Sequence, residues 1–382
     1  MSRERFVAPA DEDELRRLVV EANAADRGLL VGGGLEEPER LPGEEDHLAI
    51  GLGRLRGIVA FEPGDLTITA RSGTTVAALQ EAAAAAGQRL AIEPARPESR
   101  SLGAAVALGE DGFIAALYGE LREQVLGLRA ITGAGEILRP GGRVVKNVTG
   151  YDLRKLLCGS AGRLAIISEL SFRLRPLPVA EASFVFAGLE EGAALERGRE
   201  LRRLDHKIAG LALRRDRAGH LLALRAEGAP AAIEALAAEL RGAERLEPAA
   251  ARALWRELAA CPAPWDRRLV LRHRPAQLGR VLDLIGREGD LVVDLVAGRL
   301  RLPARDGESL PELLERSGRP WLRPELAVLA AMDDPREAEL VRRGIADLGA
   351  PSGRVAEIES RLVEVFDPRG LLMRGRRPRG LP

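Results

Sequence analysis

The sequence predicts an α+β protein, and three observations lead to this prediction. The first half alternates amphipathic helices with short strands, and glycine clusters follow several of these strands. The second half orders its helices and strands in a way that is typical of helices packed on an antiparallel sheet. Apolar residues make up 46% of the 382 residues and charged residues 30%, the composition of a globular protein that is long enough for two domains.

The N-terminal region opens with a helix. Asp11 is predicted to cap it, and Glu14 stands three residues further on, as in a capping box. A short strand over 29–31 comes next and ends in the glycines Gly32, Gly33 and Gly34. A helix, a strand and then a glycine cluster form a layout suited to holding a ligand through peptide N–H groups.

The rest of the first half is predicted as short strands and helices. We expect strands at 48–52, 57–61, 66–70, 88–93, 125–132, 136–139 and 164–174, and helices at 76–86, at 101–108 and directly after Asp152. Thr74 is predicted to cap the helix over 76–86, and Gly133-Ala134-Gly135 is predicted to close a β-hairpin. A tight turn is expected at Gly159-Ser160-Ala161-Gly162.

The segment Pro176-Leu177-Pro178 predicts a domain boundary. Beyond it we expect strands at 182–186, 210–214, 220–225, 268–273, 291–296 and 299–302, and helices at 190–204, 230–241, 249–259, 275–287, 337–348 and 354–366. The sequence therefore predicts three domains, over 1–178, 179–335 and 336–382, the last of which holds C-terminal helices and an arginine-rich tail.

The charge balance and the cysteine count exclude several classes of function. Lys and Arg total 57 and Asp and Glu total 57, so the chain lacks the basic excess of a dedicated DNA-binding protein. Cys158 and Cys261 are the only cysteines, which excludes four-thiolate iron–sulfur or zinc sites within this sequence. The sequence shows no apolar stretch of membrane-spanning length and no signal-peptide pattern. We expect a cytoplasmic protein with no nucleic-acid partner and no membrane span of its own.

One string of residues carries a family resemblance. It runs from Arg143 to Leu153 as RVVKNVTGYDL and continues from Leu157 to Leu164 as LCGSAGRL. These strings resemble the signature of the FAD-binding subunits of glycolate oxidase, which belong to the vanillyl-alcohol-oxidase, or PCMH-type, flavoprotein superfamily. The stretches FEPGDLTITARSGTTVAALQ, YGELREQVLGLRAITGAGEILRPGG and the C-terminal VFDPRGLL agree with the family in order, and the E subunit is the best fit.

The resemblance implies a PCMH-type two-subdomain FAD-binding fold, followed by an α+β cap domain and a C-terminal helical segment that returns to the FAD domain. It also implies that non-covalent FAD is held largely by peptide groups, with its pyrophosphate on the first glycine loop. The residues implied to bind FAD are Gly32, Gly33, Gly34, Ser101, Leu102, Gly103, Gly159, Ser160, Gly162, Ile166 and Ile167. Tyr151 and Asp152 are expected to support the last of these segments rather than to touch the cofactor.

The sequence departs from the family at several of these places. Between Glu36 and Asp46 there are six acidic residues and one arginine, next to the expected phosphate site. A phosphate near such a stretch is repelled by roughly 1 kcal/mol for each close, exposed charge. The family's glycine-rich stretch before the second segment has become Arg96-Pro97-Glu98-Ser99-Arg100, and Ala104 and Ala165 stand where the family has glycine.

The resemblance implies an accessory subunit of a glycolate oxidase complex that supports the oxidation of glycolate to glyoxylate and is inactive alone. No catalytic residue is predicted, because the histidines share no motif; they are His47, His206, His220 and His273. The expected partners are a catalytic flavoprotein subunit and an iron–sulfur subunit. Any membrane association is expected to go through these partners.

Three alternatives stay open. The acidic stretch and the lost glycines favour a flavin-free scaffold subunit of the same complex. An NAD-binding Rossmann domain is disfavoured, since no G-x-G-x-x-G spacing follows the strand over 29–31. An independent single-chain oxidase of sugars or alcohols would show activity as an isolated chain with an artificial dye.

Overall fold

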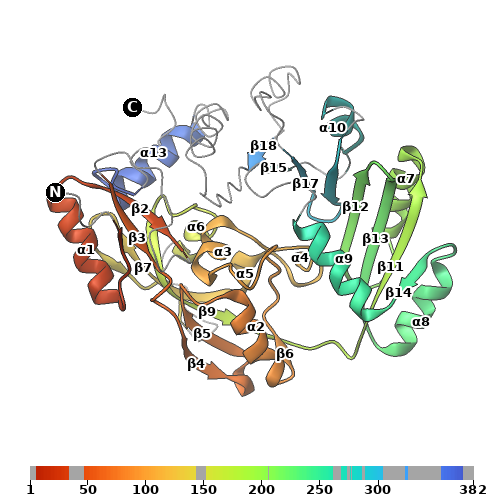
Figure 1. Cartoon of the computed structure of the whole chain (residues 1–382), viewed down its shortest axis with the longest axis horizontal. Coiled ribbons are helices and arrows are strands. Elements are labelled where there is room, and N and C mark those ends of the chain that lie inside the picture. Colours follow the sequence, from red (N-terminus) through yellow and green to blue (C-terminus); the bar gives the residue numbers. More distant parts are fainter. Residues whose placement is uncertain are drawn as a thin grey trace. The chain divides into compact units, whose positions relative to one another are not determined.

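The computed structural model describes residues 6–33, 47–142, 152–204, 206–260, 268–272, 276, 278–285, 289–303, 323–325 and 354–372. The chain divides into two compact units, which Figure 1 shows together with the element labels. Unit 1 comprises Met1–Glu110, Leu121–Pro176 and Met332–Pro382, and unit 2 comprises Asp111–Glu120 and Leu177–Ala331. The domains predicted over 1–178, 179–335 and 336–382 stay predictions.

Unit 1 contains a small parallel sheet covered by a helix. Its strands β1 (Phe6–Val7), β3 (His47–Gly51) and β2 (Gly28–Gly32) lie in that order and are all parallel. The helix α1 (Glu12–Ala24) confirms the predicted cap, because the Asp11 carboxylate accepts the peptide N–H of Glu14 at 2.8 Å. Its predicted apolar face packs against β2 and β3 in one hydrophobic cluster, in which Leu15 and Val19 are fully buried.

The second sheet of unit 1 is antiparallel and has five strands. The strands are β4 (Ile58–Glu62), β5 (Thr67–Arg71), β9 (Ala165–Arg173), β7 (Val125–Thr132) and β8 (Ile137–Leu138), in that order across the sheet. The pair β7 and β8 confirms the predicted hairpin. A short helical turn, η1 (Pro63–Asp65), joins β4 to β5.

Helices pack on this sheet and complete the core of unit 1. They are α2 (Val76–Ala85), α3 (Leu102–Leu108), α5 (Leu121–Gln124) and α6 (Leu153–Leu157). The cap of α2 is Thr75, whose hydroxyl accepts the N–H of Ala78, so the prediction of Thr74 was wrong by one residue. Thr74 instead accepts the N–H of Gly57, because its side chain lies at the turn between β5 and α2. The strand predicted over 88–93 is shorter, since β6 (Gln88–Arg89) pairs only with β10 (Arg175–Pro176).

The C-terminal helix α13 (Arg354–Phe366) packs on unit 1, and the residues after it join the parallel sheet. Asp367 is buried, and its two carboxylate oxygens accept the N–H groups of Leu371 and Leu372, each at 2.8 Å. The N–H of Leu29 on β2 donates to the carbonyl of Leu371 at 2.8 Å. The aspartate of the DPRGLL string therefore folds the chain back onto β2. The helix predicted over 337–348 lies outside the described residues.

Unit 2 is built on an antiparallel sheet of eight strands. They are β14 (Glu244–Leu246), β11 (Ala180–Leu189), β13 (Gly219–Gly228), β12 (Ile208–Asp216), β16 (Leu291–Asp294), β17 (Arg299–Pro303), β15 (Arg268–Arg272) and β18 (Arg323–Glu325), in spatial order. The helices are α7 (Glu191–Leu201), α8 (Pro230–Glu239), α9 (Pro248–Ala260) and α10 (Leu278–Ile285). The predicted antiparallel sheet with packed helices is confirmed.

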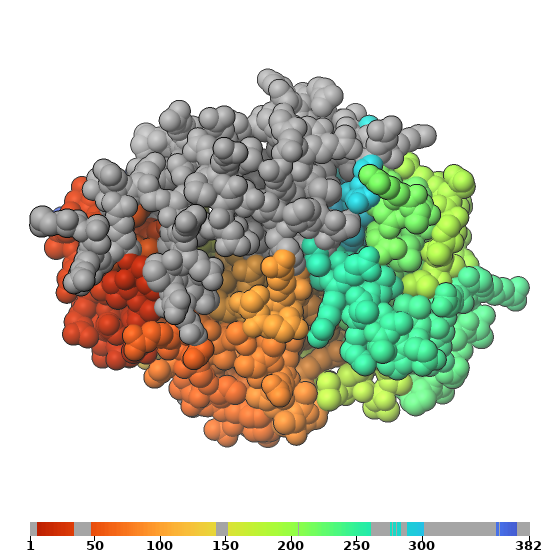
Figure 2. Space-filling model, viewed as in Figure 1, coloured from red at the N-terminus to blue at the C-terminus, as the bar shows by residue number. Residues whose placement is uncertain are grey.

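Helices of unit 2 cover both faces of its sheet. Leu222 on β13 lies close to Gly198 of α7, whereas Arg225, three residues further along the same strand, stacks on Trp255 of α9. Side chains three apart on a strand point to opposite faces, so α7 and α9 lie on opposite sides (Figure 1). In Figure 2 residues 230–260, which form α8 and α9 and are drawn in blue-green, fill one continuous part of the visible surface of unit 2.

The segment Asp111–Glu120, with the short helix α4 (Ala115–Tyr118), belongs to unit 2 although its neighbours in sequence belong to unit 1. Asp111 forms a buried ion pair with Arg299, which stands 188 residues later. The hydroxyl of Tyr118 donates to Glu227 at 2.6 Å. Among the helices in the described part of the chain, none is long and apolar enough to cross a membrane.

Candidate cofactor site

The first glycine segment lies against the start of α3. A Cβ added to Gly33 would stand 2.5 Å from the hydroxyl oxygen of Ser101 and 2.8 Å from the Cβ of Ala104. Gly33 follows directly on β2, so this close approach fixes the end of the parallel sheet next to the helix. Two of the segments predicted to bind FAD are thereby brought together. Gly34 and the acidic stretch over 36–46 lie outside the described residues.

The last predicted segment lies at the other end of α3. The N–H of Gly159 donates to the carbonyl of Val106 at 2.9 Å, and the N–H of Ala161 donates to that of Ala107 at 2.7 Å. Gly159 has φ +79° and Gly162 has φ +72°, left-handed conformations that favour glycine. Helix α3 therefore stands between the predicted glycine segments and holds one at each end.

The peptide N–H groups at the start of α3 are engaged within the protein. The N–H of Leu102 donates to the carbonyl of Thr74 and that of Gly103 donates to the carbonyl of Ser72, both at 2.8 Å. A Cβ on Gly103 would stand 2.7 Å from the Cβ of Ser72, so only glycine allows this contact. The Ser101 side chain caps the helix by accepting the N–H of Ala104. In the structure these residues fix α3 onto the end of β5.

Ile166 and Ile167 stand in the middle of the sheet. They pair with Ile131 and Ala130 on β7, and their side chains are buried in the two hydrophobic clusters of unit 1. Ala165, which replaces a glycine of the family, is also buried, at 1% exposure. Its methyl group therefore adds to the core of unit 1.

Three peptide groups of the predicted set remain available for a ligand. Within the described residues, the N–H groups of Gly33, Ser101 and Gly162 have no hydrogen-bond partner. The space around an added Cβ on Gly162 is open, with no heavy atom of the described residues within 4 Å. The hydroxyl of Ser72, which packs against Gly103 of α3, is fully buried and has no hydrogen-bond partner among the described residues.

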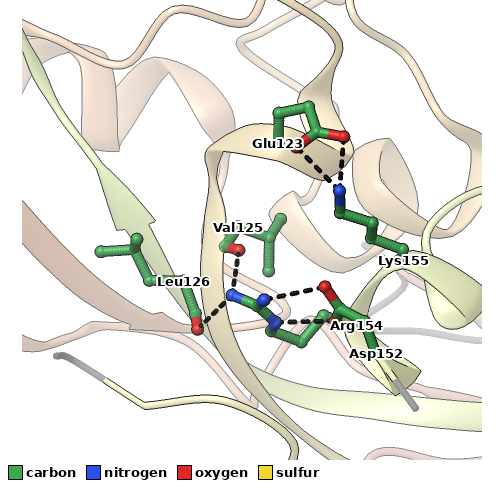
Figure 3. A network of polar contacts seen from close by, with 6 residues as sticks. All are labelled: Glu123, Val125, Leu126, Asp152, Arg154 and Lys155. Carbon is green, nitrogen blue, oxygen red and sulfur yellow. Dashed lines mark hydrogen bonds and ion pairs between the residues drawn. The ribbon is translucent and has the colours of Figure 1, made fainter. Parts of the chain in front are cut away.

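Three residues at the start of α6, Asp152, Arg154 and Lys155, form a polar network with residues of α5 and β7 (Figure 3). Arg154 donates through Nη1 to the carbonyls of Val125 and Leu126, at 3.2 and 2.9 Å, and binds both carboxylate oxygens of Asp152 at 2.8 Å. Asp152 stands at the N-cap position of α6, as expected from a helix that begins directly after it, but its side chain makes no capping hydrogen bond. The hydrogen bonds from Arg154 hold the pKa of Asp152 below its usual range. Lys155 pairs with Glu123 at the surface, at 2.7 Å.

This network has a structural role. It ties α6 to the start of β7, because the arginine bridges the helix and two strand carbonyls that no other side chain of the network reaches. The residues over 143–151, which include Lys146 and Tyr151, lie outside the described residues.

The described histidines do not form a catalytic group. His206 lies 3.5 Å from Glu239, and Nδ1 of His220 lies 3.1 Å from the carbonyl of Leu189, so each sits in its own surroundings. His47 stands at the start of β3, and His273 lies outside the described residues. Among the described residues, no group of three or more His, Cys, Asp or Glu side chains is arranged to hold a metal ion.

The comparisons with known proteins concern chiefly the N-terminal third of the chain. Residues 4–141 match the sequence model of the FAD binding domain family. This part of the chain is similar to an FAD-binding domain. Glycolate oxidase subunit GlcE of Escherichia coli strain K12 is 46% identical over 129 residues, which cover 34% of this chain and 37% of GlcE. Glycolate oxidase subunit GlcD of Bacillus subtilis is 31% identical over 121 residues, covering 32% of this chain and 26% of GlcD.

A further relative and a solved structure extend this result. A D-2-hydroxyglutarate dehydrogenase of Xanthomonas citri pv. viticola is 33% identical over 174 residues, 44% of this chain and 36% of that protein. The curated relatives are thus matched over about a third of their own length. The structure of an alkyldihydroxyacetonephosphate synthase superposes with a TM-score of 0.64 at 14% identity, covering 96% of this chain and 75% of that one. The predicted α+β, PCMH-type fold and the resemblance to glycolate oxidase subunits are confirmed.

The described residues fit the FAD that this domain family binds. Peptide N–H groups without a partner among the described residues remain at Gly33 and Ser101, near the start of α3, and at Gly162, near its other end. The space around an added Cβ on Gly162 is open, so a phosphate or a sugar can approach this peptide group closely. The other predicted residues build the frame that holds these three peptide groups in place. The sequence alone does not tell which of the predicted residues keep a free peptide N–H group and which only support the others. That difference depends on which carbonyl groups accept hydrogen bonds from each peptide N–H in the folded protein.

Proposed function

We propose that this chain is an accessory FAD-binding subunit of a glycolate oxidase (glycolate dehydrogenase) complex, in which it supports the oxidation of glycolate to glyoxylate. The observation that carries the proposal is the 46% identity over 129 residues to a glycolate oxidase subunit. The arrangement of the glycine segments around α3 supports it, since that arrangement leaves peptide donors for a phosphate-bearing cofactor.

In this proposal Gly33 and Gly162 hold FAD through their peptide N–H groups, together with the neighbouring segments predicted from the sequence. FAD supplies the acceptor for the hydride that an alcohol carbon loses on oxidation. The reaction also needs a base for the hydroxyl proton and a cation for the substrate carboxylate. The described histidines lie apart from one another, so we assign these groups to a catalytic flavoprotein subunit.

The cysteine count bears on a second partner. Electrons leaving a flavin towards a quinone commonly pass through iron–sulfur clusters held by several cysteine thiolates. This sequence contains two cysteines, so such a cluster would be held by an iron–sulfur subunit. The chain would then contribute flavin binding and subunit contacts to the complex.

Co-expression tests the proposal. The affinity-tagged chain is expressed with candidate catalytic and iron–sulfur subunits, and glycolate-dependent reduction of an artificial dye is measured for each subset. We expect co-purification of all three chains and full activity only when this chain is present. Activity of the isolated chain with glycolate, or full activity of the complex without it, would contradict an accessory role.

A flavin-free scaffold in the same complex is the second candidate. The observation that favours it is the tight packing at Gly33, where Ser101 and Ala104 already occupy the adjoining space. The flavin content of the purified complex separates the two candidates. An accessory flavoprotein gives one FAD for this chain and one for the catalytic flavoprotein, whereas a scaffold gives the catalytic FAD alone.

A further inference from the structure

One segment of unit 2 begins and ends in unit 1. The chain leaves unit 1 after Glu110 and re-enters it at Leu121, and the residues between them, Asp111–Glu120, belong to unit 2. We call this segment the strap. It starts from the last turn of α3, where the N–H of Glu110 donates to the carbonyl of Ala105 at 2.9 Å. The strap is therefore continuous with the helix that carries the predicted glycine segments at its ends.

The same turn of α3 holds the glycine segment Gly159–Gly162. The carbonyl of Val106 accepts two peptide N–H groups, that of Gly109 at 3.1 Å and that of Gly159 at 2.9 Å. The other end of the strap leads directly into α5, which packs against α6, and α6 ends two residues before Gly159. A shift at either end of the strap therefore reaches the peptide groups around Gly159.

The strap is anchored in unit 2 by an aromatic ring. The ring of Phe113 meets the ring of Trp255 on α9 edge to face, with 5.2 Å between their centroids, and the Arg301 guanidinium stacks on Phe113 at 4.8 Å. A Cβ added to Gly210 on β12 would stand 2.9 Å from the Trp255 ring and 3.3 Å from the Cβ of Phe113. Only glycine leaves room for both rings here. We call Gly210, Trp255 and Arg301 the seat of the strap.

A hydrogen bond anchors the strap near its other end. The hydroxyl of Tyr118 donates to Oε2 of Glu227 on β13 at 2.6 Å, and α4 packs on β12. Both halves of the strap are thus fixed to neighbouring strands of one sheet. Because packed side chains shift only at the cost of their contacts, the anchored strap restricts the last turn of α3 and the start of α5.

We propose that the strap couples FAD binding at the glycine segments to the stability of unit 2. This inference rests on the flavin-binding part of the proposed function. FAD bound beside Gly159 and Gly162 orders the last turn of α3, and the ordered turn keeps the strap in its seat. Such coupling is reciprocal, so FAD favours the seated strap by the same factor by which release of the strap weakens FAD binding.

Two variants loosen the strap without changing the glycine segments. Phe113→Leu alters the strap, and Trp255→Leu alters its seat; each removes the contact between the rings and keeps an apolar side chain. Trp255→Leu also loses a hydrogen bond to Ser183, which Phe113→Leu retains. The matched control is Leu236→Ala on α8, which removes a fully buried side chain of unit 2 outside the strap and its seat.

The experiment uses the full chain and two measurements. Flavin fluorescence gives the dissociation constant for FAD, and amide hydrogen exchange with and without FAD gives the local stability of unit 2. Thermal unfolding without ligand shows whether each variant is folded. The exchange measurement on the wild type needs no variant, so it tests the proposal even where a variant fails to fold.

We expect FAD to slow amide exchange in β12 and β13 of the wild type, and this slowing to be lost in Phe113→Leu and Trp255→Leu. Both variants should bind FAD at least about 5-fold more weakly than the wild type, the lower end of the usual range for coupled sites. Leu236→Ala should exchange faster in unit 2 with unchanged FAD affinity.

Three results would overturn the strap as the link while flavin binding stands. The first is unchanged exchange in unit 2 when the wild type binds FAD. The second is slowing of exchange by FAD that persists in Phe113→Leu and Trp255→Leu, and the third is a loss of FAD affinity in Leu236→Ala equal to theirs. A folded wild-type chain that binds no FAD overturns both this inference and the flavin-binding part of the proposed function.

Discussion

Replacing Gly33 with alanine tests the packing that positions the candidate site. The new methyl carbon would stand 2.5 Å from the Ser101 hydroxyl and 2.8 Å from the Ala104 methyl, both closer than side chains pack. Overfilling a packed contact costs about 1 to 3 kcal/mol. The Ser101 hydroxyl also caps α3, and loss of such a cap costs about 1 kcal/mol. We therefore expect Gly33→Ala to lower the free energy of unfolding by about 2 to 4 kcal/mol.

Urea unfolding and FAD titration measure this effect on the same samples. Ala104→Gly added to Gly33→Ala removes one of the two clashes, so the double variant should recover part of the lost stability. Gly64→Ala is the matched control in unit 1, because an added Cβ there meets no heavy atom of the described residues within 4 Å. Gly33→Ala with unchanged unfolding free energy and FAD affinity would refute the close approach of β2 to α3.

Three further predictions concern acidic side chains. Burial raises the pKa of Glu12, but hydrogen bonds from Arg129 and Ser168 outweigh it and hold the pKa below its usual range. Glu12 therefore stabilises the fold above its unfolded-state pKa, and this stabilisation is lost as the pH falls through the folded-state pKa. In urea unfolding at neutral pH, Glu12→Gln should be less stable than the wild type, and the difference in unfolding free energy between the two should become smaller in acid. Burial raises the pKa of Asp294, so its contribution to stability is favourable at low pH and is lost as the pH rises. Asp294→Asn keeps the Oδ1 acceptor, and its unfolding free energy should fall less steeply with rising pH than that of the wild type. Parallel curves of unfolding free energy against pH for the two proteins would contradict this. Asp367→Ala removes two hydrogen bonds to a carboxylate, each worth about 1.5 to 3 kcal/mol, and should lower the unfolding free energy by about 3 to 6 kcal/mol. A loss below about 1 kcal/mol would contradict the role of Asp367 in anchoring the C-terminal segment to β2.

Local patterns predicted the elements whose stability is decided by their own residues. The cap of α1 by Asp11 and the hairpin around Gly133-Ala134-Gly135 follow from short-range chemistry that the sequence displays. The antiparallel sheet of unit 2 follows from alternating strands and helices. The cap of α2 fell one residue away from its predicted place, because Thr74 and Thr75 are both good caps and only the turn geometry selects between them.

The features that the sequence did not predict depend on contacts between residues that lie far apart in the chain. Asp111–Glu120 joins unit 2 through Arg299 and Glu227, residues that stand more than a hundred positions later in the chain. In the candidate site, the glycines were found from their resemblance to a family, but their roles depend on tertiary contacts. Gly103 is required by Ser72, whereas Gly33 and Gly162 keep their peptide N–H groups available.

The central claim is that the glycine segments around α3 hold FAD. The most direct measurement is a titration of the purified full chain with FAD, followed by flavin absorbance in the visible range and by thermal unfolding. We predict one FAD per chain, a raised unfolding temperature, and release of all flavin when the protein is denatured, since the cofactor is non-covalent. A folded chain that stays colourless and shows no shift in unfolding temperature at saturating FAD would contradict the account.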